Sequence, residues 1–470
     1  MNKKIGMGCL MVIGVFFLLF SKGEVSFATA ESHGFRYEKI DTQTVRILGY
    51  EGEVEDLLEI PETLKGYSVT VIGRQAFRNK GIRELVLPEG LRKIEAYAFA
   101  FNDLEKIHLP DSLEVLEERA FGDNRLESLR VPSGVKYIEI WAFIHNNIEE
   151  VYFEEGLEKV GSGAFRGNRI KELKLPDTVK HIENYSFDRN KIEGLSIPNT
   201  TQTIGNGAFR NNSIKELVLP QGLRFLGEEA FANNHIEEVI FEGSLEKIEK
   251  RTFQNNKIEN IIFPKNLRTI EESAFQQNKL QKLSLPMGVE TIGSFAFQNN
   301  DLTLVEFATG LRTIGRSSFR DNNIEELKLP PTLGEIQRGA FMNNHLHKVE
   351  FPPGLQRIGV NGFRNNHLET LELPQALESL GKYAFYQNPV KHINLPAAIE
   401  KTMAMEEIIG THPSNEPIEE EKELENIEES TRDFFYLWER HTRFFFWMTF
   451  LMIVTGILII GRYLYKEMNK

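Results

Sequence analysis

Apolar residues recur along most of this chain with a period of 22 residues. Phenylalanine stands at fifteen positions that are spaced by 22, from Phe77 to Phe385. Counted from each Phe, further apolar residues come at five, eight, ten, fourteen and seventeen positions, and Leu91 and Ile94 are the last two in the first unit. A fixed period of this length indicates a repeat solenoid, in which each coil buries its apolar face against its neighbours.

Each unit predicts one short strand. The apolar residues at eight and ten alternate with a polar residue, as in Leu173-Lys174-Leu175, and this alternation is typical of a half-buried strand. Pro follows at eleven in twelve units and should end the strand, because it lacks the N–H that a ladder needs. Stacked coils are expected to pair these strands into one long parallel sheet.

The other recurring residues are expected to be architectural. A small residue precedes each Phe, which should fill the interior opposite the strand, and Asn follows three positions later in fourteen units. An Asn inside a tight turn can cap backbone groups of its own coil and of the neighbouring coil. This structural ladder is represented by Phe99, Phe121, Phe143, Phe165, Asn102, Asn124, Asn146 and Asn168.

The repeating unit, Ile-Gly-x-x-Ala-Phe-x-x-Asn-x-Leu-x-x-Leu-x-Leu-Pro, resembles the BspA-type leucine-rich repeats of bacterial surface proteins. The resemblance covers roughly residues 35–400 and implies a leucine-rich-repeat solenoid with a parallel β-sheet and a role in adhesion. Two departures are visible. This chain carries Asn where the family usually carries Cys, and its unit is one residue shorter than is common. Both residue types can serve the same turn, so the implied fold is unaffected.

The N-terminal residues predict export. Asn2-Lys3-Lys4, the apolar run from Ile5 to Phe20 and the small residues Ala28-Thr29-Ala30 follow the layout of a signal peptide over residues 1–30. An uncleaved N-terminal anchor is the alternative. The one cysteine, Cys9, lies in this segment, and export without a mature cysteine favours a Gram-positive bacterial surface.

The C-terminal residues predict a membrane anchor. The uncharged run from Phe444 to Ile460 predicts one transmembrane helix over 444–465, with a buried hairpin helix as the alternative. No LPxTG-like pentapeptide precedes it, so sortase processing is not expected. We therefore expect a single-pass protein in the cell membrane, with its ectodomain outside and its C-terminus in the cytoplasm.

The remaining segments complete the predicted organisation. Short strands are expected at Phe35–Ile40, Thr44–Gly49 and Ser68–Ile72, and Ile399, Met403 and Ile408 are candidates for a helical cap. The predicted order is a signal peptide (1–30), an N-terminal β cap (31–72), a solenoid of 22-residue units (73–400), an acidic linker (401–433), a juxtamembrane segment (434–443), the transmembrane helix (444–465) and a cytoplasmic tail (466–470).

Neither charge nor motifs point to chemistry. The net charge of −13 disfavours a nucleic-acid partner, which would require Lys and Arg. No phosphate loop, HExxH or nucleophile elbow occurs, so no catalytic, cofactor or metal site is predicted. His235, His345 and His367 share one register after the Asn, which indicates a tolerant turn position rather than a metal cluster.

Two candidate binding surfaces remain. The exposed strand positions seven and nine include His108, Arg130, Tyr152 and Lys174, and aromatic residues two before the Phe form a stripe of Tyr97, Trp141 and Tyr185. Such aromatics can stack sugars or anchor protein contacts, and packing over a loop is the alternative. The sequence thus favours a non-enzymatic surface protein that binds a protein or glycan ligand. The alternative is an envelope-structural module that binds cell-wall glycan or other membrane proteins of the same cell.

Overall fold

The computed structural model describes residues 25–26, 34–52 and 56–410, all of which lie within one compact unit. The predicted signal peptide (except Val25–Ser26), the acidic linker beyond residue 410, the juxtamembrane segment, the transmembrane helix and the cytoplasmic tail lie outside the described residues. No helix within the described part of the chain combines the length and the apolar character needed to cross a membrane.

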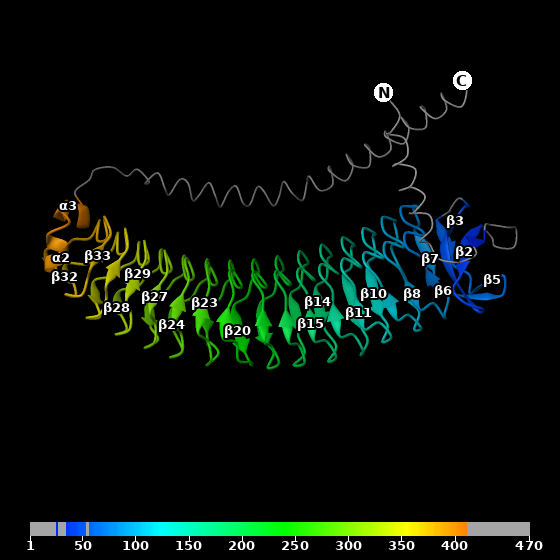
Figure 1. Ribbon diagram of the computed structural model, residues 1–470, viewed down its shortest axis with the longest axis horizontal. Coiled ribbons are helices and arrows are strands. Elements are labelled where there is room, and N and C mark those ends of the chain that lie inside the picture. The colour runs from blue at the N-terminus through cyan, green and yellow to red at the C-terminus, as the bar shows by residue number, and fades with distance from the viewer. Residues whose placement is uncertain (1–24, 27–33, 53–55, 411–470) are drawn as a thin grey trace, which may run out of the picture. The chain divides into compact units, whose positions relative to one another are not determined.

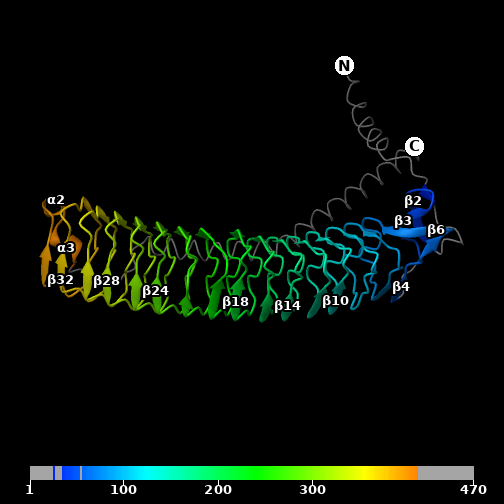
Figure 2. The same cartoon turned by 90° about the horizontal axis from the view of Figure 1, so that it is seen from below.

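The described residues form a solenoid whose coils stack in a single row (Figure 1). We name each coil by its ladder Phe, so that the Phe209 coil comprises residues 209–230. Most coils contribute a strand segment that begins four positions after the Asn and a second, two-residue strand before the next Phe. Strands of successive coils lie side by side and run parallel. Figure 2, seen from below, shows this for the first strand segment of the coils.

The first ladder contains the predicted strands. They begin seven positions after the Phe, at alternating exposed and buried residues, and the Phe99 coil has no such strand among its described residues. Its members are β4 (Leu57–Glu59), β7 (Glu84–Val86), β10 (Ser128–Val131), β12 (Glu150–Phe153), β14 (Glu172–Lys174), β16 (Gly194–Ser196), β18 (Glu216–Leu219), β20 (Glu238–Phe241), β22 (Asn260–Ile261), β24 (Lys282–Ser284), β26 (Leu304–Glu306), β28 (Glu326–Lys328), β30 (Lys348–Glu350), β32 (Thr370–Glu372) and β34 (His392–Asn394).

The second ladder lies sixteen and seventeen positions after each Phe, where a variable residue precedes a buried apolar one. Its members are β8 (Lys93–Ile94), β9 (Val115–Leu116), β11 (Tyr137–Ile138), β13 (Lys159–Val160), β15 (His181–Ile182), β17 (Thr203–Ile204), β19 (Phe225–Leu226), β21 (Lys247–Ile248), β23 (Thr269–Ile270), β25 (Thr291–Ile292), β27 (Thr313–Ile314), β29 (Glu335–Ile336), β31 (Arg357–Ile358) and β33 (Ser379–Leu380).

The expectation of one long sheet was wrong. The second ladder provides the long sheets, one of 12 strands that ends at β19 and one of 7 strands that begins at β21. The first ladder is divided into pairs, except for the three strands β18, β20 and β22. A two-residue strand shows no alternation along the sequence, so the second ladder could not be recognised from periodicity.

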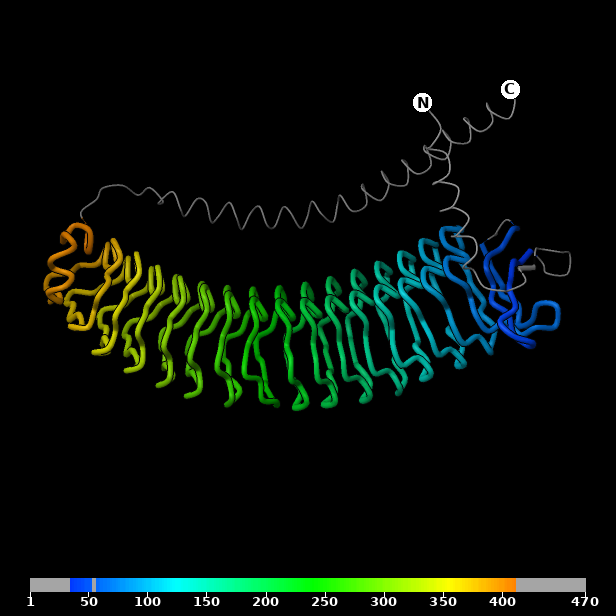
Figure 3. Tube along the Cα trace, in the orientation of Figure 1, coloured from blue at the N-terminus to red at the C-terminus, as the bar shows by residue number. Residues whose placement is uncertain are grey.

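A column of stacked Phe rings fills the interior (Figure 3 traces the coils around it). Neighbouring ladder rings from Phe77 to Phe385 lie 5.2–6.1 Å apart at 3–16° to each other, and all are fully buried. The apolar strand residues, such as Leu217 and Leu226, are buried and pack around this column. Packing between coils therefore supplies the core that no single coil could form.

The Asn column binds adjacent coils through their backbones. Asn146, for example, donates from Nδ2 to the carbonyl oxygens of Phe143 (3.2 Å) in its own coil and Phe121 (3.0 Å) in the previous one. Its Oδ1 accepts from the N–H of Leu126 at 3.1 Å. The same pattern recurs at Asn102, Asn124 and Asn168, where the side chains are likewise buried. One side chain thus satisfies buried groups that the tight turn leaves without backbone partners.

Two caps close the stack. At the N-terminus, β2 (Phe35–Lys39), β3 (Thr44–Tyr50) and β6 (Tyr67–Ile72) lead into the second ladder, with β1 (Val25–Ser26) paired to β2 and β5 (Thr63–Leu64) to β6. At the other end come α2 (Ala397–Glu400) and α3 (Met405–Ile408), and the Phe385 N–H donates to the Ile408 carbonyl at 3.1 Å.

The core therefore continues beyond residue 400, where the linker was predicted to begin. Ile399 and Ile408 are buried, and the connected core runs from Phe35 to Ile408. The core of the described residues lies within 34–410, so we expect a segment with these bounds to fold by itself.

Candidate binding surfaces

The residues nine positions after each ladder Phe form one line, which we call the +9 column and which is exposed except at the half-buried Arg130. Four of the predicted site residues, His108, Arg130, Tyr152 and Lys174, follow one another in it on successive coils. Parallel pairing places Arg130 beside Tyr152, whose side chain is 64% exposed. The strand alternation turns the flanking residues inward, so these side chains point away from the core.

The charged members of this group differ in how far they are engaged. The Arg130 guanidinium contacts Asp111 at 2.9 Å and also pairs with Glu154, and these carboxylates raise the pKa of Arg130. His108 lies 3.7 Å from Glu89. The side chains of Tyr152 and Lys174 form no hydrogen bond or ion pair with a residue that the structure describes. They remain open to a partner.

Sequence reasoning missed the middle of the same column. Val218, Ile240 and Ile262 occupy it on three consecutive coils and are 45%, 47% and 86% exposed. They lie on β18 and β20 and directly after β22, the three strands that pair continuously. The signal was present in the sequence, because the residue nine after each Phe can be read down all fifteen units.

The aromatic stripe two before the Phe has a different role. Tyr97, Trp141 and Tyr185 adopt left-handed backbone conformations with φ of 61°, 58° and 56°. Every coil places the residue at this position, and the one two after the Phe, in that region. The strain is therefore part of the repeated turn and does not mark a particular site.

Neighbouring coils cover the faces of these rings. An added Cβ on Gly163 would lie 2.6 Å from the Trp141 ring, and one on Gly207 would lie 2.5 Å from the Tyr185 ring. The guanidinium of Arg119 lies 5.9 Å from the Trp141 ring centre. Trp141 and Tyr185 are each followed by a glycine in the next coil, which leaves room for their rings, whereas Arg119 follows Tyr97. Sugar stacking needs a free ring face, so this stripe is better explained as packing over a turn.

A buried ion cluster reinforces the same turns. The fully buried carboxylate of Asp188 accepts from Arg166 Nε at 2.9 Å and Arg210 Nε at 3.1 Å, and Tyr185 lies between these two cations. Burial lowers the pKa of Arg210, but Asp188 and Glu229 raise it by more, so the net pKa is raised. The cluster is a paired, hydrogen-bonded structural element.

The packing of Tyr185 leads to a prediction. Gly207→Ala should lower the free energy of unfolding by about 1–2 kcal/mol, because the new Cβ meets the ring and the backbone is left-handed at φ 58°. Urea denaturation followed by circular dichroism would measure the change.

Gly339→Ala is the matched control. Its φ is 60°, but an added Cβ would meet the Ser317 hydroxyl at 3.2 Å and the Met342 Cβ at 4.0 Å, and no ring. Equal losses in the two variants would mean that the ring contributes nothing beyond backbone strain.

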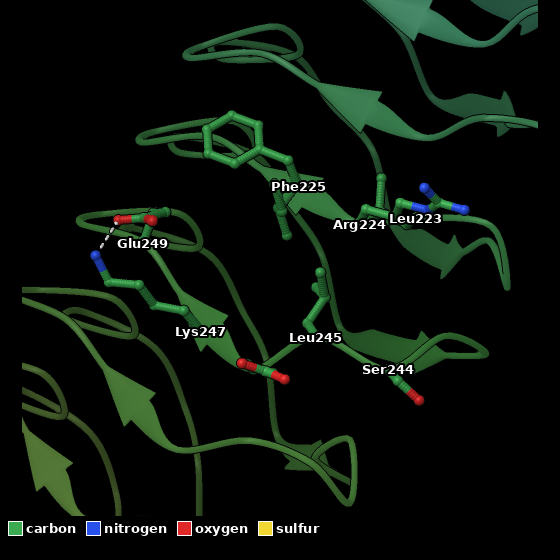
Figure 4. A pocket seen from close by; sticks show the side chains of 9 residues that line it. Leu223, Arg224, Phe225, Ser244, Leu245, Lys247 and Glu249 are labelled. Atoms are coloured by element: carbon green, nitrogen blue, oxygen red, sulfur yellow. Dashed lines mark ion pairs between the residues drawn. The ribbon is translucent and has the colours of Figure 1, made fainter.

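A shallow notch interrupts the second ladder. It is lined by Leu223, Arg224, Phe225 and Leu226 of one coil and Ser244, Leu245, Glu246, Lys247 and Glu249 of the next (Figure 4). No backbone hydrogen bond joins residues 223–227 to 245–249, all of which the structure describes. The rings of Phe231 and Phe253, which follow β19 and β21 in the chain, have the widest spacing of the Phe column, at 6.1 Å.

The sequence of the Phe231 coil departs from the repeat beside the notch. Most coils have Pro at eleven, and in the Phe209 coil the Leu223 N–H donates to the Pro220 carbonyl at 3.1 Å. The Phe231 coil has Glu242-Gly243-Ser244 instead, and no bond of this kind forms at Leu245. Lys247 contacts Glu249 at 2.9 Å and Glu271 at 3.0 Å, and Arg224, Ser244 and Glu246 are the other polar residues that line the notch.

The histidines show no ligand geometry. His345 and His367 stack with ring centres 5.5 Å apart, as their shared register requires. Within the part of the chain that the structure describes, no group of three His, Cys, Asp or Glu side chains is placed to hold a metal ion.

These features define the class of protein. A parallel solenoid with one Leu-x-Leu strand, one Phe and one Asn per coil is a leucine-rich-repeat protein, a fold generally used in protein–protein interaction and typically a non-catalytic scaffold. The model of the BspA type leucine rich repeat region matches residues 70–193, 180–303 and 290–404. The chain belongs to the BspA-type leucine-rich-repeat family.

Several solved structures are similar. A leucine-rich repeat protein from Bacteroides ovatus is 20% identical, with 80% of this chain and 100% of that chain covered and a TM-score of 0.47. A leucine rich cell surface protein from Faecalibacterium prausnitzii is 13% identical, with 84% and 99% covered and a TM-score of 0.39. A search of curated proteins gives no match.

Proposed function

We propose that this chain is a non-enzymatic cell-surface protein that recognises a protein ligand through the exposed face of its first ladder. The observation that supports this most directly is the +9 column. It is exposed and varies from coil to coil, whereas the Phe, Asn and aromatic-stripe positions are occupied in holding the coils together.

The chemistry of the column suits protein recognition. Tyr and Arg are enriched among the residues that dominate binding energy, and Tyr152 stands beside Arg130 in register. The aliphatic residues Val218, Ile240 and Ile262 add apolar area that a partner could remove from water. Charged residues on both sides of them would align a partner and favour its approach.

Placement at the cell surface is part of the proposal. It is supported by the signal-peptide pattern of residues 1–30, the acidic segment after the solenoid and the apolar run predicted to span the membrane at 444–465. In this arrangement the solenoid would stand outside a Gram-positive cell, with residues 466–470 in the cytoplasm. The acidic segment would act as an extended spacer.

The proposal predicts ligand capture by the isolated solenoid. The segment 31–410 should retain a protein from extracellular-matrix extracts or cell surfaces, and Tyr152→Ala should weaken retention by about tenfold or more if it is an anchor residue. Tyr137→Ala is the matched control, because Tyr137 is 50% exposed but lies on the second ladder.

Two outcomes would contradict the proposal. Retention by isolated peptidoglycan alone would favour the envelope-structural role, in which the solenoid binds glycan or membrane proteins of its own cell. Turnover of a substrate from a hydrolase panel would contradict the non-enzymatic assignment.

A further inference from the structure

The +9 column changes character twice along the solenoid. Its first part carries cations and a tyrosine, its middle is aliphatic, and its last part is mostly acidic. In chain order the column reads Val86, His108, Arg130, Tyr152, Lys174, Ser196, Val218, Ile240, Ile262, Ser284, Glu306, Lys328, Glu350, Glu372 and Asn394. Ile240 stands on the eighth of the fifteen coils, at the centre.

Residues at equal distances on the two sides of Ile240 are complementary, so the column matches a reversed copy of itself. Lys174 corresponds to Glu306, Arg130 to Glu350 and His108 to Glu372, and no two like charges correspond. Nearer the centre, Ser196 corresponds to Ser284 and Val218 to Ile262, while Tyr152 corresponds to Lys328, a cation that can lie over its ring.

We propose that the partner of this face is a second copy of the same chain, packed face to face with its coils in the opposite order. A two-fold axis would pass through the interface at Ile240 and relate the two columns. Such an isologous contact brings each residue opposite its counterpart twice, once in each copy. The inference rests on the proposed use of the first-ladder face and names its partner.

The charges favour a second copy of this chain over an unrelated protein as the partner. Lys174 and Glu306 are both exposed, and neither forms an ion pair with a described residue. Within one copy they are six coils apart, roughly 30 Å at the spacing of paired strands, so they cannot neutralise each other there. A second copy in the opposite order would pair both of them.

The aliphatic residues fix the register. With the axis at Ile240, the three aliphatic residues of one copy meet those of the other and leave water together. Moving the axis by one coil, to Ile262, would set Val218 against Glu306 and Ile240 against Ser284. Burying a carboxylate or hydroxyl against an aliphatic side chain without a hydrogen bond is unfavourable, so neighbouring registers are disfavoured.

The contact must extend beyond the aliphatic residues. A stable interface buries about 800 Å² on each partner, which three aliphatic side chains do not supply. The +9 residues on either side of the aliphatic three, out to Arg130 and Glu350, are therefore part of the contact.

The neighbouring column, seven positions after each Phe, brings like charges together and so opposes dimerisation. It would place Glu238 near the axis, next to the same residue of the second copy, and Glu150 opposite Glu326 of the second copy. Repulsion there limits the affinity.

The experiment measures self-association of the segment 31–410 by sedimentation equilibrium. Wild type should form a dimer that weakens as salt is added. Ile240→Glu should weaken dimerisation by at least about tenfold, since it buries two carboxylates at the centre. Val115→Glu, at an exposed aliphatic residue on the second ladder, should leave dimerisation unchanged. Glu238→Gln should tighten the dimer.

A charge exchange provides the decisive test. Lys174→Glu alone sets two carboxylates against each other at these ranks, and Glu306→Lys alone sets two ammonium groups against each other. Each variant should therefore dimerise at least about tenfold more weakly than wild type. In an equal mixture, a dimer of one copy of each variant sets a carboxylate opposite an ammonium group in both pairs, so mixing should recover dimers.

A variant that carries both substitutions should recover dimers, because every pair at these ranks is then opposite in charge again. No contact within one copy explains this recovery, since the two residues are six coils apart in one chain.

The inference is overturned if wild type stays monomeric at every soluble concentration. It is also overturned if dimers persist in Ile240→Glu, or if the doubly substituted variant shows no recovery. These failures are separable from failure of the proposed function. A monomeric solenoid that still captures a matrix protein through Tyr152 keeps the function and loses only the second copy as partner.

Discussion

Phe209→Ala is expected to lower the free energy of unfolding by about 3–5 kcal/mol. The Phe209 ring is fully buried and lies between the rings of Phe187 at 5.5 Å and Phe231 at 5.2 Å. Its removal leaves a cavity that the neighbouring coils cannot close, because the Asn column and both ladders fix their spacing. Urea denaturation would measure the loss, and hydrogen exchange would locate it in the Phe209 coil and its two neighbours.

Phe225→Ala provides a control within the same coil. Its ring is 45% exposed on the second ladder and belongs to no stack. The expected change is below about 1 kcal/mol, as for exposed positions in general. If both variants lost the same stability, the Phe column would not be the principal core element that its burial indicates.

Asn146→Ala should cost about 2–3 kcal/mol. The N–H of Leu126, which is buried, would lose the Asn146 Oδ1 as its acceptor, and the Phe121 and Phe143 carbonyls would each lose one of their donors. The two carbonyls keep bonds to Asn124 and Asn168, so the unpaired N–H accounts for most of the cost. Amide exchange at Leu126 should accelerate more than exchange elsewhere.

The adjacent residue is the matched control. The Asn147 side chain forms no hydrogen bond with a residue that the structure describes, and only its backbone N–H is engaged, with Leu126 O at 3.0 Å. Asn147→Ala should therefore leave the urea midpoint almost unchanged. A midpoint shift as large as that of Asn146→Ala would refute the role given to the Asn column.

Much of the fold could be predicted because the interior repeats with the sequence. The Phe, the Asn and the Leu-x-Leu pair each recur at one position, and the residues that stack are those that recur. The second ladder escaped prediction because its strands are two residues long and begin with a residue that varies, such as Lys93 or Thr203.

The binding surfaces were harder to read for a different reason. Whether an aromatic side chain is free depends on the residue 22 positions later, and Trp141 is covered because Gly163 leaves room for its ring. The aliphatic middle of the +9 column likewise emerges only when Val218, Ile240 and Ile262 are read together. Both features depend on how equivalent positions differ between coils, and neither is visible within one coil.

The notch between β19 and β21 has a consequence for how the molecule responds to tension. In a stack where each coil touches only its neighbours, cooperativity passes through every junction in turn, and the weakest one divides the array. At this junction the second ladder contributes no backbone bonds, while the Phe column, the Asn column and the first ladder remain continuous. A solenoid pulled through its two ends would part first between the Phe209 and Phe231 coils, and each half would keep its own sheet and cap.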